Sequence, residues 1–287
     1  MNTNSNVYTV VYTTVIVILV AAVLAVVSQS LKGKQEANEK ADTISQMLTA
    51  AGFGEKAEFQ AMGNAAVLQK YGDEIAQAFT VGTDGQKIAD LSIENREVFS
   101  PSMLKKQNYI IKGMQEGQPT LPVFVFKNNV TVVPVYGAGL WGPVWGYIAF
   151  QPDQVTMVGS YFDHESETAG LGAKIKDDPA FQKQFTGEKA SFGEDKVFEI
   201  VKGGSPLDES GAEIMDNKVD AITGATMTSN GLADAINLWL KAYAAYFGAT
   251  SSEVCDHACE AAGQTCDKPC CQDNAEACAD EQSCETK

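Results

Sequence analysis

The hydrophobic pattern begins with an uninterrupted apolar run close to the N-terminus. Val7 to Val27 contains 21 residues and no charged side chain. As an α-helix this run would extend roughly 32 Å, which matches the hydrocarbon core of a membrane. A cleaved signal peptide is the alternative, but it would begin with a basic segment and have a shorter apolar region. The pattern therefore predicts a transmembrane helix over residues 7–27.

Two further helical patterns precede the central part of the chain. After a polar connector, apolar residues recur near helical spacing over Ala41–Gly52 and again over Ala65–Phe79. We therefore expect residues 28–50 to form a connector and a short helix, with a folded domain beginning at residue 51.

The pattern changes between Leu121 and His164. Short runs rich in β-branched and aromatic residues are separated there by Asn, Gly and Pro-Asp turns, which is typical of an antiparallel meander. A last amphipathic pattern over Thr228–Phe247 predicts a helix that packs on this sheet. The expected fold class is α+β. An N-terminal transmembrane helix precedes a single domain, residues 51–248, with a mainly antiparallel sheet flanked by helices.

Composition and charge exclude several classes of function. The formal net charge is -16, and no cluster of Lys and Arg suited to phosphate contacts is found, which argues against nucleic acid as a partner. His164 and His257 are the only histidines, so a metal site built from several imidazoles within the domain is excluded. The seven cysteines all lie at or beyond Cys255. Within the domain neither a bound metal nor a catalytic side chain is expected, and its chemistry must come from elsewhere.

An acidic, cysteine-rich tail is expected over residues 249–287. Its spacings, such as Cys255-x3-Cys259, differ from the paired C-x2-C of a zinc ribbon. Three disulfides and one free thiol are expected in an oxidising compartment, and a disordered or metal-binding tail in a reducing one. A solvated acidic extension is the simplest interpretation.

Candidate chemistry lies at the start of the last helix, in the segment DAITGATMTSNG over residues 220–231. Unpaired backbone N–H groups and the positive end of the helix dipole meet there. Gly224 with Ala225 would let a phosphate approach the backbone closely. An alternative is that Thr228 or Ser229 merely caps the helix.

The same segment resembles the flavinylation motif Asp-x-x-(Ser/Thr)-Gly-Ala-Thr of the FMN-binding domains in respiratory flavoproteins. The matching residues are Asp220, Thr223, Gly224, Ala225 and Thr226. In that family a flavin transferase joins the FMN phosphate to the hydroxyl of the last threonine, which by position is Thr226. The resemblance thus implies a covalent FMN on Thr226, with Asp220 as part of the signal read during attachment. The cofactor-binding residues it implies here are Thr223, Gly224, Ala225 and Thr228.

Two other segments extend the resemblance. Residues 167–172 read ETAGLG and are similar to the family's flavin-contacting loop Glu-Thr-Pro-Gly-Leu-Gly, with Ala169 in place of the proline. Residues 137–150 contain GLWGP, which looks like a segment of the C subunits of sodium-translocating NADH:quinone oxidoreductases. Trp141 in this segment is a candidate flavin neighbour, although a tryptophan between strands is more often a core residue. The flavin contacts expected from these two segments are Glu167, Thr168, Gly170, Leu171, Gly172 and Trp141.

The resemblance implies a membrane-anchored, electron-carrying component of a translocase. Such a complex couples sodium export to the reduction of ubiquinone by NADH, and this component would have no NADH site of its own. It would relay electrons between redox centres of neighbouring subunits through its FMN. The partners implied are the other subunits of a multi-subunit respiratory complex, a flavin transferase during maturation, and membrane lipid. The alternatives are the G subunit of an Rnf-type ferredoxin:NAD oxidoreductase and a flavin-free, membrane-anchored assembly module.

The resemblance also implies a location in the bacterial inner membrane. The family crosses that membrane once and places its domain on the periplasmic side. Lys32, Lys34 and Lys40 follow the apolar run and would favour a cytoplasmic domain instead. Because the N-terminal segment is short and nearly uncharged, this opposing signal is weak, and we expect a periplasmic domain.

Overall fold

A computed structural model describes residues 6–92, 98–203 and 216–261, the side chains of 249–261 excepted. Its centre is a six-stranded sheet in the order β2-β1-β3-β4-β5-β6, in which every pairing is antiparallel. The strands are β1 Ile75–Val81, β2 Lys87–Asp90, β3 Leu121–Phe126, β4 Thr131–Ala138, β5 Pro143–Phe150 and β6 Met157–His164.

The meander predicted between Leu121 and His164 is confirmed as β3 to β6. Strands β4 and β5 pair along their whole length, from Thr131 opposite Phe150 to Ala138 opposite Pro143. Their side chains are almost all buried because helices cover both faces of the sheet.

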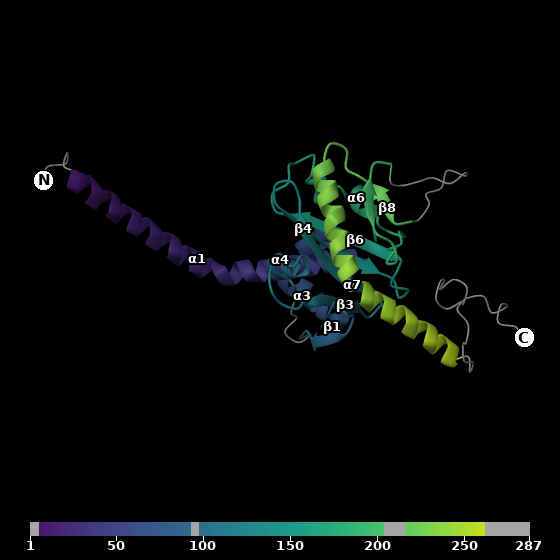
Figure 1. Cartoon of the computed structure of the whole chain (residues 1–287). Coiled ribbons are helices and arrows are strands. Elements are labelled where there is room, and N and C mark those ends of the chain that lie inside the picture. Colours follow the sequence, from purple (N-terminus) through teal and green to yellow (C-terminus); the bar gives the residue numbers. More distant parts are fainter. Residues whose placement is uncertain (1–5, 93–97, 204–215, 262–287) are drawn as a thin grey trace, which may run out of the picture.

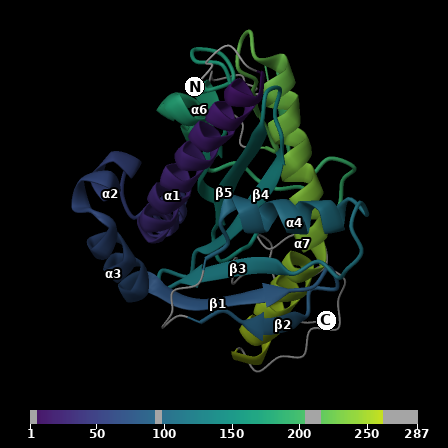
Figure 2. The same ribbon diagram turned by 90° about the vertical axis from the view of Figure 1, so that its left-hand side faces the viewer.

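Each face of the sheet is covered by one long helix (Figures 1 and 2). On one face lie α1 (Asn6–Ala50), α2 (Lys56–Met62) and α3 (Asn64–Glu74), over a core that includes Ile44, Met47 and Tyr147. On the other face lie α4 (Pro101–Ile111) and α7 (Thr226–Ala261), over a larger core that includes Trp239 and Phe247. The expected α+β fold with a mainly antiparallel sheet flanked by helices is therefore confirmed.

The N-terminal helix is longer than the pattern predicted. A connector and a separate short helix were expected over residues 28–50, but α1 continues without a break from Asn6 to Ala50. The polar stretch contains no proline and several good helix formers, so nothing in it ends the helix. Residues 7–39 project away from the sheet, and only the last turns, from Ala41, are buried against it (Figure 1).

The helix expected over Ala65–Phe79 is only partly correct. Helix α3 ends at Glu74, and Ile75–Val81 forms strand β1 in the same sheet. Strand β1 is secured by antiparallel partners on both sides, β2 and β3, which lie later in the chain.

A smaller region follows β6 and leads to the last helix. It contains α5 (Lys174–Asp177), α6 (Pro179–Lys183) and a two-stranded parallel sheet of β7 (Glu199–Val201) and β8 (Lys218–Asp220). The helix expected over Thr228–Phe247 corresponds to α7, which begins at Thr226 and continues past the expected domain boundary at residue 248. The cysteine-rich residues 262–287 lie outside the described residues, so the expectations about the tail are untested.

Candidate functional site

The three segments singled out in the sequence meet at one hollow of about 220 Å³. They come from the β4–β5 loop, from the segment after β6, and from the turn that leads into α7. The lining residues are Leu140, Glu167, Thr168, Leu171, Gly172, Gly224, Ala225, Thr226, Met227 and Thr228. Segments almost 90 positions apart in the chain thus form one site.

The turn before α7 fixes where the helix begins. Gly224 has a φ of +82°, a left-handed conformation that favours glycine, and the Ala225 N–H donates to Ile222 O at 3.0 Å. The Ile222 N–H in turn donates to Ser229 Oγ at 3.2 Å, which ties the turn to the helix. As a result Thr226 is the first helical residue, and its side chain is exposed.

One buried carboxylate joins the three segments. Glu167 Oε1 accepts the Trp141 N–H at 2.9 Å, and Glu167 Oε2 accepts the Thr228 Oγ1 hydroxyl at 2.6 Å. Glu167 is 8% exposed and Thr228 is 1% exposed. The suggestion that Thr228 or Ser229 acts only as a helix cap therefore does not describe their observed bonds, which connect the helix to Glu167 and to the preceding turn.

The loop over residues 167–172 is closed by backbone bonds although it lacks the family's proline. The N–H groups of Leu171 and Ala173 both donate to Thr168 O at 3.1 Å. Gly170 has a φ of +75°, so the turn depends on glycine at that position. Ala169 is exposed and leaves the closed form of the loop intact.

The structure brings most of the expected site residues to the hollow, but not all of them. Four expected residues lie outside its lining: Trp141, Gly170, Thr223 and Asp220. Asp220 ends β8 and its N–H donates to Gln184 Oε1 at 2.8 Å. Trp141 is 68% exposed, so it is not a core residue, and its backbone rather than its side chain is held by Glu167.

Two lining residues were missed in the sequence, Leu140 and Met227. Both are large, apolar and exposed, at 51% and 62% respectively. Each stands next to a predicted residue, Leu140 before Trp141 and Met227 after Thr226. An apolar residue in the polar first turn of a helix was the available signal for Met227.

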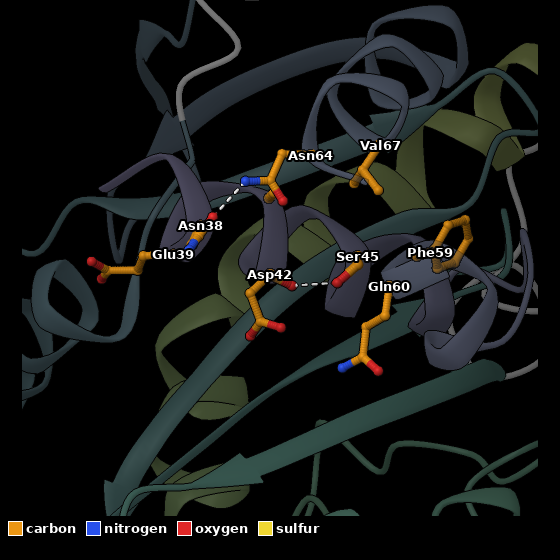
Figure 3. Close-up of a pocket in the computed structure, with 9 residues that line it drawn as sticks. Asn38, Glu39, Asp42, Ser45, Phe59, Gln60, Asn64 and Val67 are labelled. Atoms are coloured by element: carbon orange, nitrogen blue, oxygen red, sulfur yellow. Dashed lines mark hydrogen bonds between the residues drawn. The ribbon is translucent and has the colours of Figure 1, made fainter. Parts of the chain in front are cut away.

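A larger hollow, of about 400 Å³, lies elsewhere, between α1 and the α2–α3 pair (Figure 3). Several of its polar groups already have partners: Asn64 Nδ2 donates to Asn38 Oδ1 at 2.6 Å, and Ser45 Oγ donates to Asp42 O at 2.7 Å. None of the three sequence motifs reaches it. We therefore assign the candidate site to the smaller hollow.

Comparison with known proteins agrees with that assignment. Residues 139–241 match the family model of the FMN-binding domain. This stretch begins in the β4–β5 loop and ends within α7, so it contains every residue that lines the smaller hollow.

Several relatives share one description. The C subunit of the Na(+)-translocating NADH-quinone reductase of Pasteurella multocida (strain Pm70) is 36% identical over 124 residues, which are 41% of this chain and 45% of that relative. The corresponding protein of Yersinia pestis is 25% identical over 247 residues, 79% of this chain and 85% of the relative. The chain thus matches slightly less than half the length of the Pasteurella protein, and most of the length of the Yersinia protein.

Solved structures show the same fold. The crystal structure of the C subunit of the Na(+)-translocating NADH-quinone reductase from Parabacteroides distasonis ATCC 8503 has 28% identity and a TM-score of 0.60, and the match covers 76% of this chain and 96% of that one. The crystal structure of Shewanella oneidensis NqrC, at 24% identity and a TM-score of 0.56, supports the fold alone; the match covers 75% of this chain and 99% of that one. Together with the site, these matches show that residues 139–241 resemble the FMN-binding domain and that the chain is similar to the C subunits of sodium-translocating NADH-quinone reductases.

Proposed function

We propose that this chain is an electron-carrying, membrane-anchored component of a sodium-translocating NADH:quinone oxidoreductase. Its FMN is covalently attached by a phosphoester bond to Thr226. The observation that carries this proposal is the hollow in which the three motif segments meet, with the exposed Thr226 side chain in its lining.

The environment of the hydroxyl groups favours Thr226 as the point of attachment. Thr228 is buried, and its hydroxyl donates a hydrogen bond to Glu167 Oε2. Ser229 is also buried, and its hydroxyl accepts a backbone N–H from the turn. Thr223 is exposed but lies outside the lining of the hollow. Among the hydroxyl-bearing residues of the motif, Thr226 is therefore the one that is both exposed and part of the lining.

The start of α7 also suits a phosphate group. The N–H groups of a helix's first turn have no partner within the helix, and the helix dipole favours negative charge there. The first turn of α7 has no acidic side chain of its own, and the Glu167 carboxylate beside it already accepts the Trp141 N–H and the Thr228 hydroxyl. In the attached form the FMN phosphate would be a diester, with a lower charge than the monoester of free FMN, at this helix end.

The size of the hollow bears on how the flavin would be exposed. Pockets that enclose small ligands usually have volumes of about 300–1,000 Å³, and this one, at about 220 Å³, is smaller. A flavin tethered at its edge would therefore extend beyond it, near the exposed side chains of Leu140, Leu171 and Met227. Partial exposure suits a cofactor that exchanges electrons with neighbouring subunits.

In this proposal the cofactor and the protein have different roles. The flavin, when bound, accepts and gives up electrons, and the chain holds and orients it. Sodium export, quinone reduction and the NADH site would depend on the other subunits of the complex. A flavin transferase would act during maturation.

Helix α1 provides the proposed anchor. It is long and apolar enough to cross a membrane, with a mean hydropathy of 2.9 over its most apolar window, and none of that window is buried in the domain. We propose that it spans the bacterial inner membrane once, in contact with lipid, with the domain in the periplasm. The lysines that follow the apolar run remain the argument for the opposite orientation.

The test is a measurement of covalent flavin on the full-length chain, produced in a host with a flavin transferase. The denatured and washed protein is expected to stay yellow and to show the mass increment of one esterified FMN. Thr226→Ala should lose both signals. Thr83→Ala removes another exposed threonine, in the turn between β1 and β2, and should keep both.

Two results would contradict the proposal. A colourless wild-type chain of unmodified mass would favour the flavin-free assembly module. A flavin that stays attached in the Thr226→Ala variant would place the bond on another residue. In the assembled complex, the Thr226→Ala variant should also abolish quinone reduction by NADH while leaving the complex intact.

A further inference from the structure

Glu167 has a position that the flavin contact expected from the family motif does not explain. Its two carboxylate oxygens accept hydrogen bonds from two other segments, the Trp141 N–H in the β4–β5 loop and the Thr228 hydroxyl in the first turn of α7. The two bonds are 2.9 and 2.6 Å long, within the ordinary range for such groups, and the side chain is almost fully buried. One side chain thus connects all three walls of the hollow.

The chain leaves room for this carboxylate by means of two glycines. A Cβ at Gly139 would lie 2.5 Å from Glu167 Oε1, and a Cβ at Gly172 would lie 2.4 Å from Glu167 Oε2. The same Cβ at Gly172 would lie 2.5 Å from Thr228 Oγ1. Any other residue at these positions would displace the carboxylate, so its place is closely defined on both sides.

The backbone of Glu167 is held as well. Its N–H donates to His164 Nδ1 at 3.1 Å, and the His164 N–H donates to Asp163 Oδ1 at 2.7 Å. Asp163 is itself buried at the end of β6. Glu167 is therefore anchored to the end of strand β6, and its carboxylate holds the start of α7 and the β4–β5 loop by hydrogen bonds.

The chemistry of the group argues against a direct role in holding the cofactor's phosphate. An ionised carboxylate has no proton to donate, and its charge would repel a phosphate. We propose that Glu167 is a positioning residue: it fixes the distance between the walls of the hollow and the direction of the first turn of α7. This inference builds on the proposed function, because the hollow is taken as the flavin site.

The consequence concerns Thr226, which lies two residues before Thr228 in the same turn. Holding Thr228 fixes where the Thr226 hydroxyl is presented. Holding the Trp141 backbone fixes the adjacent Leu140, which also lines the hollow. Loss of the carboxylate should therefore loosen both sides of the site.

Two variants of Glu167 separate geometry from charge. In Glu167→Gln the amide oxygen can still accept the Trp141 N–H, and the amide nitrogen can donate to Thr228 Oγ1. In Glu167→Ala both bonds are lost. Glu165→Ala is the matched control, because it removes an exposed carboxylate two residues away on the same segment.

The first readout needs no flavin. Hydrogen exchange of the Trp141 amide is measured in full-length protein produced without the transferase. Because Glu167→Ala removes the acceptor of the Trp141 N–H, it should speed this exchange by at least about tenfold. Glu167→Gln and Glu165→Ala should leave it within about threefold of the wild type.

The second readout is the cofactor itself, in protein produced with the transferase. Glu167→Ala should lower the fraction of chains with covalent FMN and change the visible circular dichroism of the flavin that is attached. Glu167→Gln should restore both, and Glu165→Ala should match the wild type. Thr228→Val, which keeps the volume of the side chain, should lower loading and leave the Trp141 amide protected.

The outcomes distinguish this inference from the proposed function. Wild-type exchange, loading and circular dichroism in Glu167→Ala would overturn the positioning role, as would a Gln variant that behaves like the Ala variant. If Glu167→Ala fails to fold, normal loading in Thr228→Val would overturn it. A wild-type chain without FMN would instead overturn the proposed function, and the exchange measurement would still test whether Glu167 holds the loop.

Discussion

The two long helices lie on opposite faces of one sheet and are held there by different chemistry. Beyond its first turn, α7 contacts the sheet mainly through apolar and aromatic side chains, with Trp239 and Phe247 buried. Beneath α1 the contact also contains buried polar side chains, among them Ser45 and Gln46, and a buried carboxylate from the sheet, Asp163.

The polar contact beneath α1 is a network of hydrogen bonds. Gln46 Nε2 donates to Asp163 Oδ2 at 3.0 Å, and Gln46 Oε1 accepts from Trp145 Nε1 at 3.3 Å. Asp163 Oδ1 also pairs with Lys176 Nζ at 2.8 Å. The helix expected to enter the membrane is thereby joined to the strand that leads to the Glu167 segment.

The difference suggests a division of roles. Apolar packing contributes most of the stability of a domain but tolerates small shifts, whereas a buried polar network is favourable only when every group meets its partner. We therefore expect α7 to contribute chiefly to stability, and the last turns of α1 to be fixed in one register on the sheet. Four changes test this comparison by chemical unfolding of the full-length chain in detergent.

The largest effect is expected on the α7 side. Trp239 is fully buried, and its Nε1–H donates to Tyr136 O at 2.9 Å. Trp239→Ala should lower the free energy of unfolding by about 3–5 kcal/mol, because it leaves a cavity and an unpaired carbonyl. Trp239→Phe is the control and should cost less. A loss below about 1 kcal/mol for the Ala variant would contradict the role given to α7.

On the α1 side, Asp163→Ala removes the acceptor for Gln46 and Lys176. The expected loss is roughly 2–3 kcal/mol, less than for a fully buried ion pair, because the Lys176 side chain is 40% exposed and can turn to water. Asp163→Asn keeps an acceptor for Gln46 and should lose less. Equal stability of the Ala variant and the wild type would show that the network does not hold α1.

Alkaline pH should weaken the α7 side through Tyr246. Burial raises the pKa of the Tyr246 phenol from its ordinary value of 10.0 to about 12. As the pH rises, the phenol loses its proton at a lower pH in the unfolded chain than in the folded one. The contribution of the protonated Tyr246 phenol to the free energy of unfolding is therefore complete below pH 10 and is lost between about pH 10 and 12. By pH 12 the loss should reach about 2 kcal/mol. In Tyr246→Phe the free energy of unfolding should fall by about 2 kcal/mol less than in the wild type over this pH range. A variant whose stability falls with pH as steeply as that of the wild type would contradict the prediction.

The smallest effect is expected in the exposed part of α1. Lys32 Nζ lies 3.9 Å from Glu36 Oε1, and both side chains are 66% exposed. Glu36→Ala should change the free energy of unfolding of the domain by less than about 0.5 kcal/mol. Asp42→Ala is the contrast, since Asp42 pairs at 2.6 Å with the largely buried Lys56 where α1 reaches the domain. An effect of Glu36→Ala as large as that of Asp42→Ala would remove the distinction between the two halves of the helix.

The strands β3 to β6 could be predicted because the sequence pattern that defines each one lies within the strand and its flanking turns. Each has an alternating or apolar run bounded by turn residues, as in the Asn-Asn turn between β3 and β4. Strand β1 could not be predicted in this way. Its sequence IAQAFTV directly continues a helical pattern, and its strand conformation depends on pairing with β3, some 40 residues later.

The site could be predicted in part for the same reason. The segments around Thr226, Glu167 and Trp141 are each visible as short motifs. Their meeting at one hollow, and the use of Glu167 to join them, depend on how β4, β6 and α7 pack. Leu140 was overlooked because its place in the lining arises only from this packing, and Met227 because an apolar residue in the first turn of a helix is by itself a weak signal.

Helix α1 passes from its apolar segment into the domain without interruption. Each residue of an α-helix adds about 100° of rotation and about 1.5 Å of rise. The number of residues between Val27 and Asn38 therefore sets the orientation of the proposed flavin hollow around the axis of the proposed anchor. One residue added or removed between Val27 and Lys32 would leave the contacts of the domain in place and still turn the hollow by about 100° around that axis. The length of this stretch, and not the identity of its side chains, sets the orientation of the domain on the proposed anchor.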